Sequence, residues 1–207
     1  MSEFIDCRLF YSKINRAKYI PHLDFMRAFE RAFVRSKLPL WWTEGFNPHL
    51  YLTFALPLSV GVEGTRESVD FRLTKDVPFA IIKEVMSKCL PDDVPVIEVS
   101  RPVFKATEIV SAEYEFFCDD IEKAAKLLES EQIIVSKKTK KGISSFNLKE
   151  HIKDVKIVDN TVSLVLPAGG TLNLNISLAT NWLEENGAET RGINRTKIFT
   201  TYGKEFL

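Results

Sequence analysis

Three features of the sequence predict an α+β protein made of two tandem ferredoxin-like (βαββαβ) modules. The first half of the chain alternates strand and helix patterns in the order βαββαβ, and two helices on one face of a four-stranded antiparallel sheet produce this order. The second half shows a similar but less regular rhythm, and a Pro-containing connector at residues 101–107 separates the halves. We therefore expect an N-terminal module at 1–106 and a C-terminal module at 107–207.

The elements of the first module follow from hydrophobic periodicity and from residues that end helices. After His22, apolar side chains recur at three- and four-residue spacing until Pro39, a pattern typical of an amphipathic helix. Asp76 offers an N-cap to a second helix, which ends before Pro91. The expected elements are a strand at 7–14, a helix at 22–37, strands at 50–56 and 67–73, a helix at 76–90 and a strand at 94–99.

In the second module, turn residues separate shorter patterns. Asp119 or Asp120 can cap one helix, and Ser177 can cap another that Gly187 ends. A lysine cluster around Gly142 indicates the tip of a hairpin. The expected elements are a strand at 112–118, a helix after 120, hairpin strands at 132–137 and 143–148, strands at 155–167 and 171–176, a helix after 177 and a strand at 193–202.

The composition is that of an ordinary globular chain, with 45% hydrophobic and 27% charged residues among 207. No stretch approaches the roughly 18–20 apolar residues that span a bilayer, so no membrane association is expected. The N-terminal residues lack the basic start and apolar run of a secretory signal, which predicts a cytoplasmic protein. Cys7, Cys89 and Cys118 are far apart and form no CxxC pair, so neither a metal site nor a cofactor is expected.

The net charge is zero, from 28 basic and 28 acidic residues, but the charges are unevenly distributed. Residues 1–40 hold eight Lys or Arg against four acids, and residues 135–157 hold seven lysines against two acids. Between them, residues 91–122 hold nine acids and two basic residues. This distribution is compatible with two basic surfaces on the folded protein.

The most unusual stretch is residues 41–63, in which aromatic residues crowd around a Gly-Phe-Asn-Pro-His turn. In a binding loop, an aromatic ring would stack on a base and His49 would supply a hydrogen bond. The alternative is a packed loop between modules, in which the aromatic residues, Trp42 among them, belong to the core. The candidate binding residues of this turn are Gly45, Phe46, Asn47 and His49.

Three basic segments are candidates for binding RNA phosphates. Arg27, Arg31 and Arg35 repeat every four residues and form one stripe along the first predicted helix. A solvated helix face with ordinary ion pairs explains this stripe equally well, and a solubilising loop would explain the hairpin lysines. The remaining basic candidates are Lys137, Lys138, Lys140 and Lys141 at the hairpin and Arg195 near the C-terminus.

His22 and His49 are candidates for a catalytic pair. His22 stands at the start of the first predicted helix, where the positive end of the helix dipole lowers the pKa of a histidine. Two imidazoles at one phosphate could act as acid and base in phosphodiester cleavage. The motifs GxxxxGK[ST], GxSxG, HExxH and CxxxCxxC are absent, as is a GxGxxG after a strand, which argues against self-contained catalysis.

Two neighbouring segments, HLDFMRAFERAFVRSKLPL (22–40) and EGFNPHLYLTFALPLSVGVE (44–63), resemble the radical-SAM-linked (radical-SAM-associated) protein family, a domain of unknown function. GINRTKIF (192–199) resembles the C-terminal segment of that family. The resemblance implies a stand-alone member encoded beside a radical-SAM protein, which would be its partner, and implies no settled activity. Relatives often carry serine before the helix histidine, where this chain has Pro21.

Three functions are compatible with these observations. The leading hypothesis is a non-catalytic accessory module that binds a radical-SAM partner and presents an RNA substrate through its basic surfaces. The second is a metal-independent endoribonuclease that uses His22 and His49, in line with a fold-level similarity to ferredoxin-like proteins that process CRISPR repeats. The third is a protein-interaction adaptor without nucleic acid, in which the aromatic loop contacts the partner.

Overall fold

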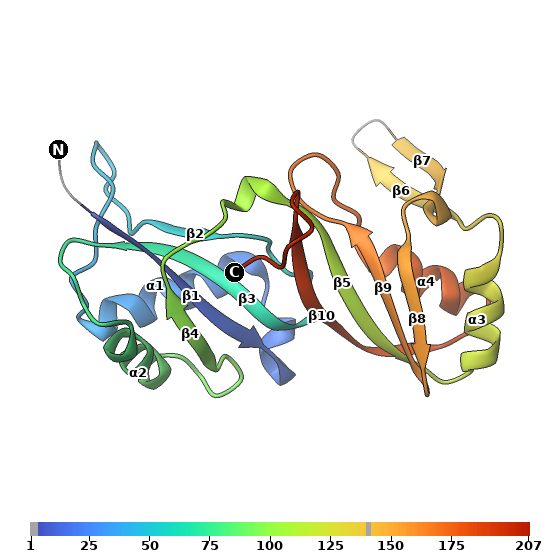
Figure 1. Cartoon of the computed structure of the whole chain (residues 1–207), viewed down its shortest axis with the longest axis horizontal. Coiled ribbons are helices and arrows are strands. Elements are labelled where there is room, and N and C mark those ends of the chain that lie inside the picture. Colours follow the sequence, from blue (N-terminus) through green and yellow to red (C-terminus); the bar gives the residue numbers. More distant parts are fainter. Residues whose placement is uncertain (1–3, 140–141) are drawn as a thin grey trace. The chain divides into compact units, whose positions relative to one another are not determined.

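The computed structural model describes residues 4–139 and 142–207, which form two compact units. Unit 1 comprises the chain up to Ala106 together with Leu207, and unit 2 comprises Thr107–Phe206. The described residues contain four α-helices and mostly antiparallel strands, which confirms the α+β class (Figure 1). None of the helices in this part of the chain has the length and apolar character needed to cross a membrane.

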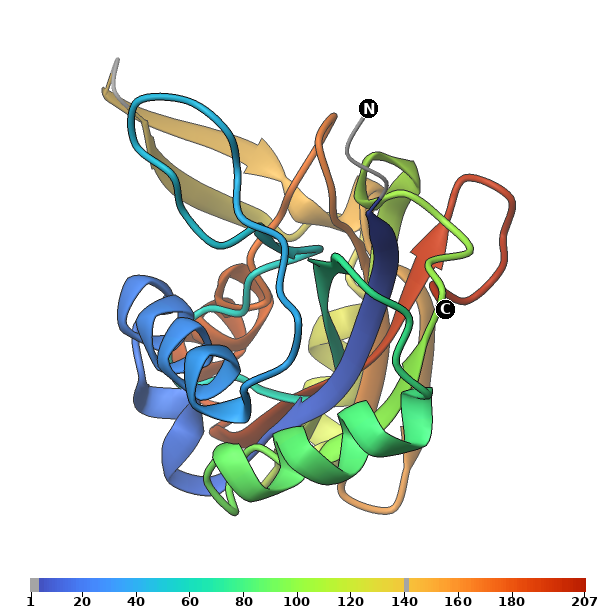
Figure 2. The ribbon, with the colours of Figure 1, turned by 90° about the vertical axis from the view of Figure 1, so that its left-hand side faces the viewer.

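Unit 1 is a four-stranded antiparallel sheet with two helices on one face. Its strands lie in the order β4-β1-β3-β2, and α1 and α2 pack next to each other on the same side (Figure 2). The elements lie close to the predicted boundaries. They are β1 (Ile5–Lys13), α1 (His22–Ser36), β2 (Leu52–Phe54), β3 (Glu63–Leu73), α2 (Phe79–Cys89) and β4 (Val96–Ser100).

The core of unit 1 is built on alternation along β1 and β3. Every second residue of a strand points to the same face, so apolar side chains of both strands meet beneath α1 and α2. Helix α1 contributes aromatic rings at four-residue spacing, which place one side of the helix against the sheet. The buried aromatic residues of this core are Tyr11 of β1, Phe25, Phe29 and Phe33 of α1, and Phe71 of β3.

The opposite face of this sheet carries a charged pair. Arg8 of β1 is paired in register with Asp70 of β3, and its guanidinium donates to both carboxylate oxygens, at 2.6 and 2.9 Å. The same guanidinium donates to the carbonyl oxygen of Phe104 at 2.8 Å. Because Arg8 is fully buried, these acceptors compensate the cost of removing its charge from water.

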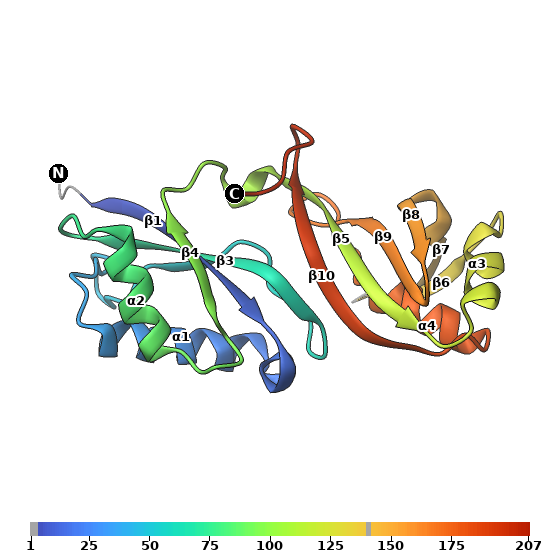
Figure 3. The ribbon, with the colours of Figure 1, turned by 60° about the horizontal axis from the view of Figure 1, so that its bottom comes forward.

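Unit 2 also has a four-stranded antiparallel sheet, in the order β10-β5-β9-β8 (Figure 3). The two sheets share one strand order. If the strands of each unit are numbered along the chain, with β6 and β7 left out, the spatial order in both sheets is fourth, first, third, second. The elements are β5 (Ile109–Cys118), α3 (Ile121–Glu129), β6 (Ile134–Thr139), β7 (Gly142–Asn147), β8 (Lys153–Val158), β9 (Thr161–Pro167), α4 (Ser177–Glu185) and β10 (Thr190–Thr200). The hairpin of β6 and β7 stands apart from the four-stranded sheet.

The predicted strand at residues 171–176 is wrong. The chain runs there without a strand partner, because β9 already pairs with β5 on one side and with β8 on the other. Leu174 and Ile176 are nevertheless buried, which accounts for the strand-like apolar pattern. Gly169 allows the chain to turn here, since its φ is +127° and a Cβ atom would lie 2.1 Å from the carbonyl oxygen of Ile109.

We expect Asp70→Asn to lower the free energy of unfolding by about 3 kcal/mol, because the buried guanidinium of Arg8 would lose its counter-charge. Chemical denaturation measures this loss. The matched control is Glu84→Gln, whose carboxylate pairs with Lys88 on the exposed side of α2. An Asp70→Asn protein that is as stable as the control would contradict this role for the pair.

Candidate functional site

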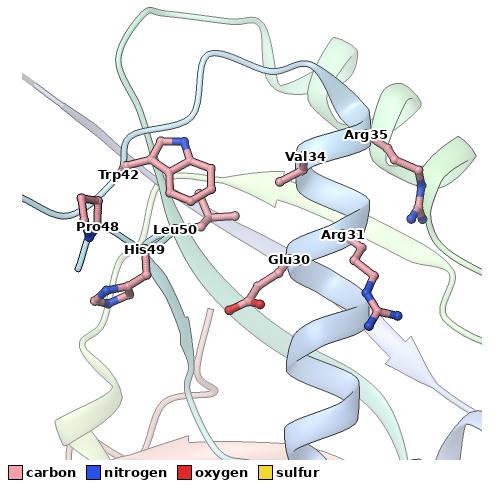
Figure 4. A pocket seen from close by; sticks show the side chains of 8 residues that line it. All are labelled: Glu30, Arg31, Val34, Arg35, Trp42, Pro48, His49 and Leu50. Carbon is pink, nitrogen blue, oxygen red and sulfur yellow. The ribbon is translucent and has the colours of Figure 1, made fainter.

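A cavity of about 480 Å³ opens in unit 1 between α1 and the loop that follows it (Figure 4). We call it the α1 pocket. Its volume lies within the range of small-ligand and side-chain binding pockets. It is lined by Glu30, Arg31, Val34 and Arg35 of α1 and by Trp42, Pro48, His49 and Leu50 of the loop.

The loop is held at its base by short-range backbone pairing. Trp42 and Leu50 form an antiparallel bridge, and the backbone N–H of Thr43 donates to the carbonyl oxygen of His49 at 2.9 Å. Leu50 is buried in the core of unit 1 and anchors the returning arm. At the turn, Gly45 has a φ of +122°, which side chains of L-residues rarely adopt. The loop therefore presents its residues from a fixed base.

The two adjacent tryptophans have different environments. Trp41 packs against the ring of Phe4, with centroids 5.2 Å apart, and near the guanidinium of Arg72. Trp42 is 47% exposed and lines the α1 pocket. This difference follows from the extended backbone, in which successive side chains point to opposite sides. Trp41 therefore packs within unit 1, whereas Trp42 is open to solvent at the pocket.

Phe46 is the most exposed large apolar residue in the described part of the chain. It stands in the turn between Gly45 and Asn47, close in sequence to the loop residues that line the α1 pocket. Exposing a phenylalanine fully to water is unfavourable by about 1.5–3 kcal/mol relative to burial.

His49 braces its own loop. Its Nδ1 lies 3.2 Å from the carbonyl oxygen of Asn47 and 3.0 Å from Oγ1 of Thr43, and its backbone N–H also donates to that hydroxyl at 3.0 Å. A carbonyl oxygen only accepts, so the contact with Asn47 assigns the proton of the neutral ring to Nδ1. The imidazole thus stabilises the turn.

The α1 side of the pocket separates acidic and apolar groups from basic ones. Glu30 and Val34 extend from the helix toward the loop, whereas Arg31 and Arg35 extend away from it (Figure 4). Residues four apart share a helix face, and neighbouring residues are about 100° apart around the axis. The side chains directed at the aromatic loop are consequently a carboxylate and a valine.

The predicted arginine stripe is present, but its members have different partners. Arg27 forms an ion pair with Asp24 at 3.1 Å and does not line the pocket. Arg35 donates to the carbonyl oxygen of Cys89 at 2.7 Å. Arg31 is exposed and has no hydrogen-bond or ion-pair partner among the described residues.

His49 lines the α1 pocket, whereas His22 lies at the start of α1, away from the residues of the helix that line it. His22 begins α1, eight residues before Glu30, which corresponds to about 12 Å along the helix axis. Its ring packs edge-on against Phe54 with centroids 5.5 Å apart, and it is not among the residues that line the α1 pocket.

The pKa of His22 is lowered from 6.5, as predicted, but the main cause differs. Partial burial disfavours the charged ring, and the positive charge of Lys13 adds to the effect. The Lys13 ammonium lies inside the core, where it donates to the carbonyl oxygen of Ile20 at 2.9 Å and sits over the ring of Phe25. The sequence offered no sign of this buried lysine.

The other basic candidates belong to unit 2. Lys137 and Lys138 lie on β6, and Lys140 and Lys141 lie outside the described residues. Arg195 was expected to be exposed; instead it is 3% exposed on β10 and has contacts of its own. Arg195 therefore offers no free cation to a phosphate.

No group of three or more His, Cys, Asp or Glu side chains among the described residues is arranged to hold a metal ion. Cys7 and Cys118 are buried and Cys89 is half-buried. Burial raises the pKa of Cys7 to about 11, so this thiol stays protonated and unreactive at neutral pH.

We expect the protein to become less stable as the pH falls through 6.5. Below that value the unfolded chain binds a proton at His22 that the folded state, with its lowered pKa, still excludes. Denaturation midpoints at several pH values between about 7.5 and 5.5 measure the effect. His22→Gln should make the denaturation midpoint depend less strongly on pH. An unchanged pH dependence would contradict the role of His22.

Comparison with protein families gives one match, which covers residues 7–180 and is described as an uncharacterized protein conserved in bacteria (DUF2344). A comparison with curated proteins gives no match. The matched range contains the whole α1 pocket, from α1 to Leu50. The chain belongs to the DUF2344 family of uncharacterized bacterial proteins.

Proposed function

We propose that this protein is a non-catalytic accessory module and that its α1 pocket binds a protein partner. The observation that carries the proposal is the half-exposed indole of Trp42 beside a pocket floor of Val34 and Leu50. Tryptophan and other aromatic residues next to apolar pockets are the residues that most often dominate binding energy at protein interfaces. Phe46, whose ring is fully exposed, belongs to the same loop two residues before Pro48.

The partner proposed is a radical-SAM protein. This identity rests on the resemblance of residues 22–40 and 44–63 to the radical-SAM-linked family. Seven of the eight residues that line the α1 pocket lie within these two segments, and Trp42 lies between them. The segments that carry the resemblance are thus the segments that build the pocket, which supports a link between the pocket and the partner.

We also propose that each unit is a ferredoxin-like module. The support is the shared strand order, fourth-first-third-second, with a helix after the first strand and another before the last. In unit 2 the hairpin of β6 and β7 would be an insertion between α3 and β8. Under this proposal the α1 pocket lies on the helix side of the first module and leaves the opposite sheet face to other contacts.

Val34→Asp is expected to abolish co-purification with the radical-SAM protein encoded beside this one, because it places a second carboxylate on the apolar pocket floor. Val60→Asp is the matched control, since Val60 is similarly exposed (57% against 54%) and does not line the pocket. Circular dichroism verifies that both variants fold. Equal retention of the partner by both variants would contradict the proposal.

RNA binding along α1 is a second candidate function, favoured by one observation. The guanidinium of Arg31 is exposed and has no partner among the described residues, so it is available to a phosphate. Arg27 and Arg35 are exposed on the same stretch of helix. This candidate uses the arginine side of α1, which points away from the aromatic loop, although Arg31 and Arg35 also contribute to the lining of the α1 pocket.

If RNA binds there, Arg31→Gln should reduce the affinity for single-stranded RNA. A plot of the logarithm of the binding constant against the logarithm of the salt concentration should become less steep by about 0.7, because one phosphate contact is lost. Filter binding over a series of salt concentrations measures both quantities. Arg16→Gln removes an exposed guanidinium elsewhere in unit 1 and serves as the control. Identical slopes for the two variants would remove RNA from the function. The separate positions of His22 and His49 give no support to an endoribonuclease.

A further inference from the structure

We propose that the α1 pocket recognises an arginine side chain of the partner. This inference rests on the proposed function and adds the chemistry of the residue that enters the pocket. It depends on three groups that converge there: the carboxylate of Glu30, the indole of Trp42 and the apolar floor formed by Val34 and Leu50.

The first argument is charge complementarity. Glu30 is directed toward the loop, is half-buried, and has no ion-pair or hydrogen-bond partner in the described part of the chain. Arg31 and Arg35 also line the pocket, but both side chains extend from α1 away from the loop that Glu30 faces. Arg35 donates to the carbonyl oxygen of Cys89, and Arg27, outside the pocket, pairs with Asp24. A half-buried carboxylate gains most from a ligand that brings positive charge and hydrogen-bond donors.

The second argument concerns the indole. Tryptophan has the strongest attraction for cations among aromatic side chains, and guanidinium groups stack on its face. Trp42 exposes about half of its surface at the pocket. A guanidinium could therefore lie against the indole while its N–H groups donate to Glu30.

The third argument is the apolar floor. Val34, Leu50 and Pro48 form much of the lining, and such a surface suits the three methylene groups of an arginine stem. A phosphate or carboxylate ligand would meet Glu30 with the same sign of charge. An apolar side chain would leave that carboxylate without a hydrogen-bond donor. An unsatisfied buried polar group costs about 1–3 kcal/mol, which corresponds to a loss of affinity of roughly 5- to 150-fold.

The test uses the full-length protein with its tryptophan indoles labelled with ¹⁵N. N-acetyl-arginine amide is titrated and the Trp42 indole signal, assigned with Trp42→Phe, is followed by NMR. We expect a saturable shift with a dissociation constant on the order of 1 mM. N-acetyl-citrulline amide has nearly the same shape without the charge and should bind about tenfold more weakly or not at all.

Glu30→Gln should weaken arginine binding by about tenfold, whereas Glu84→Gln on α2, outside the pocket, should leave it unchanged. Equal binding of arginine and citrulline, unchanged binding by Glu30→Gln, or no saturable shift with arginine would each overturn the inference. If Val34→Asp still abolishes co-purification in that case, the proposed function holds and a partner side chain other than arginine enters the pocket. If the partner co-purifies equally with Val34→Asp, the proposed function is itself contradicted.

Discussion

The packing of α1 on the sheet of unit 1 is the constraint on which the candidate site depends. Phe25, Phe29 and Phe33 are fully or almost fully buried and contact Tyr11 and Phe71 of the strands, with ring centroids 4.7–5.7 Å apart. Burial of each ring contributes about 1.5–3 kcal/mol. These contacts fix the rotation of the helix, so that Glu30 and Val34 have to face the aromatic loop while the arginines face away.

The same core fixes the other wall of the pocket. Leu50 is inserted among the residues that α1 covers, and the bridge between Leu50 and Trp42 transmits this anchoring to the indole. Thr43 and His49 then brace the turn through side-chain hydrogen bonds. A pocket built in this way is present before any partner binds, which limits the conformational entropy that association would cost.

Much of the fold could be predicted from the sequence, because hydrophobic periods of 3.6 and 2 residues and the Pro and Gly residues that end elements are local signals. Residues 171–176 escaped prediction because their apolar side chains pack without strand pairing. For the site, Trp42 and His49 were identifiable, but Glu30 and Val34 were not. Their role depends on which face of α1 meets the loop, and that is a tertiary property. The burial of Arg195 and Lys13 is likewise a tertiary property, since both cations lie on strands and are only 3% exposed.

Binding at the α1 pocket and purely electrostatic binding would involve different parts of the chain. Hydrogen–deuterium exchange of the full-length protein, with and without a purified radical-SAM protein as the proposed partner, tests this most directly. The account predicts slower exchange in two segments of unit 1, the second half of α1 around Val34 and the loop at residues 42–50. Slowed exchange confined to unit 2, or no change in the loop when the complex forms, would contradict it.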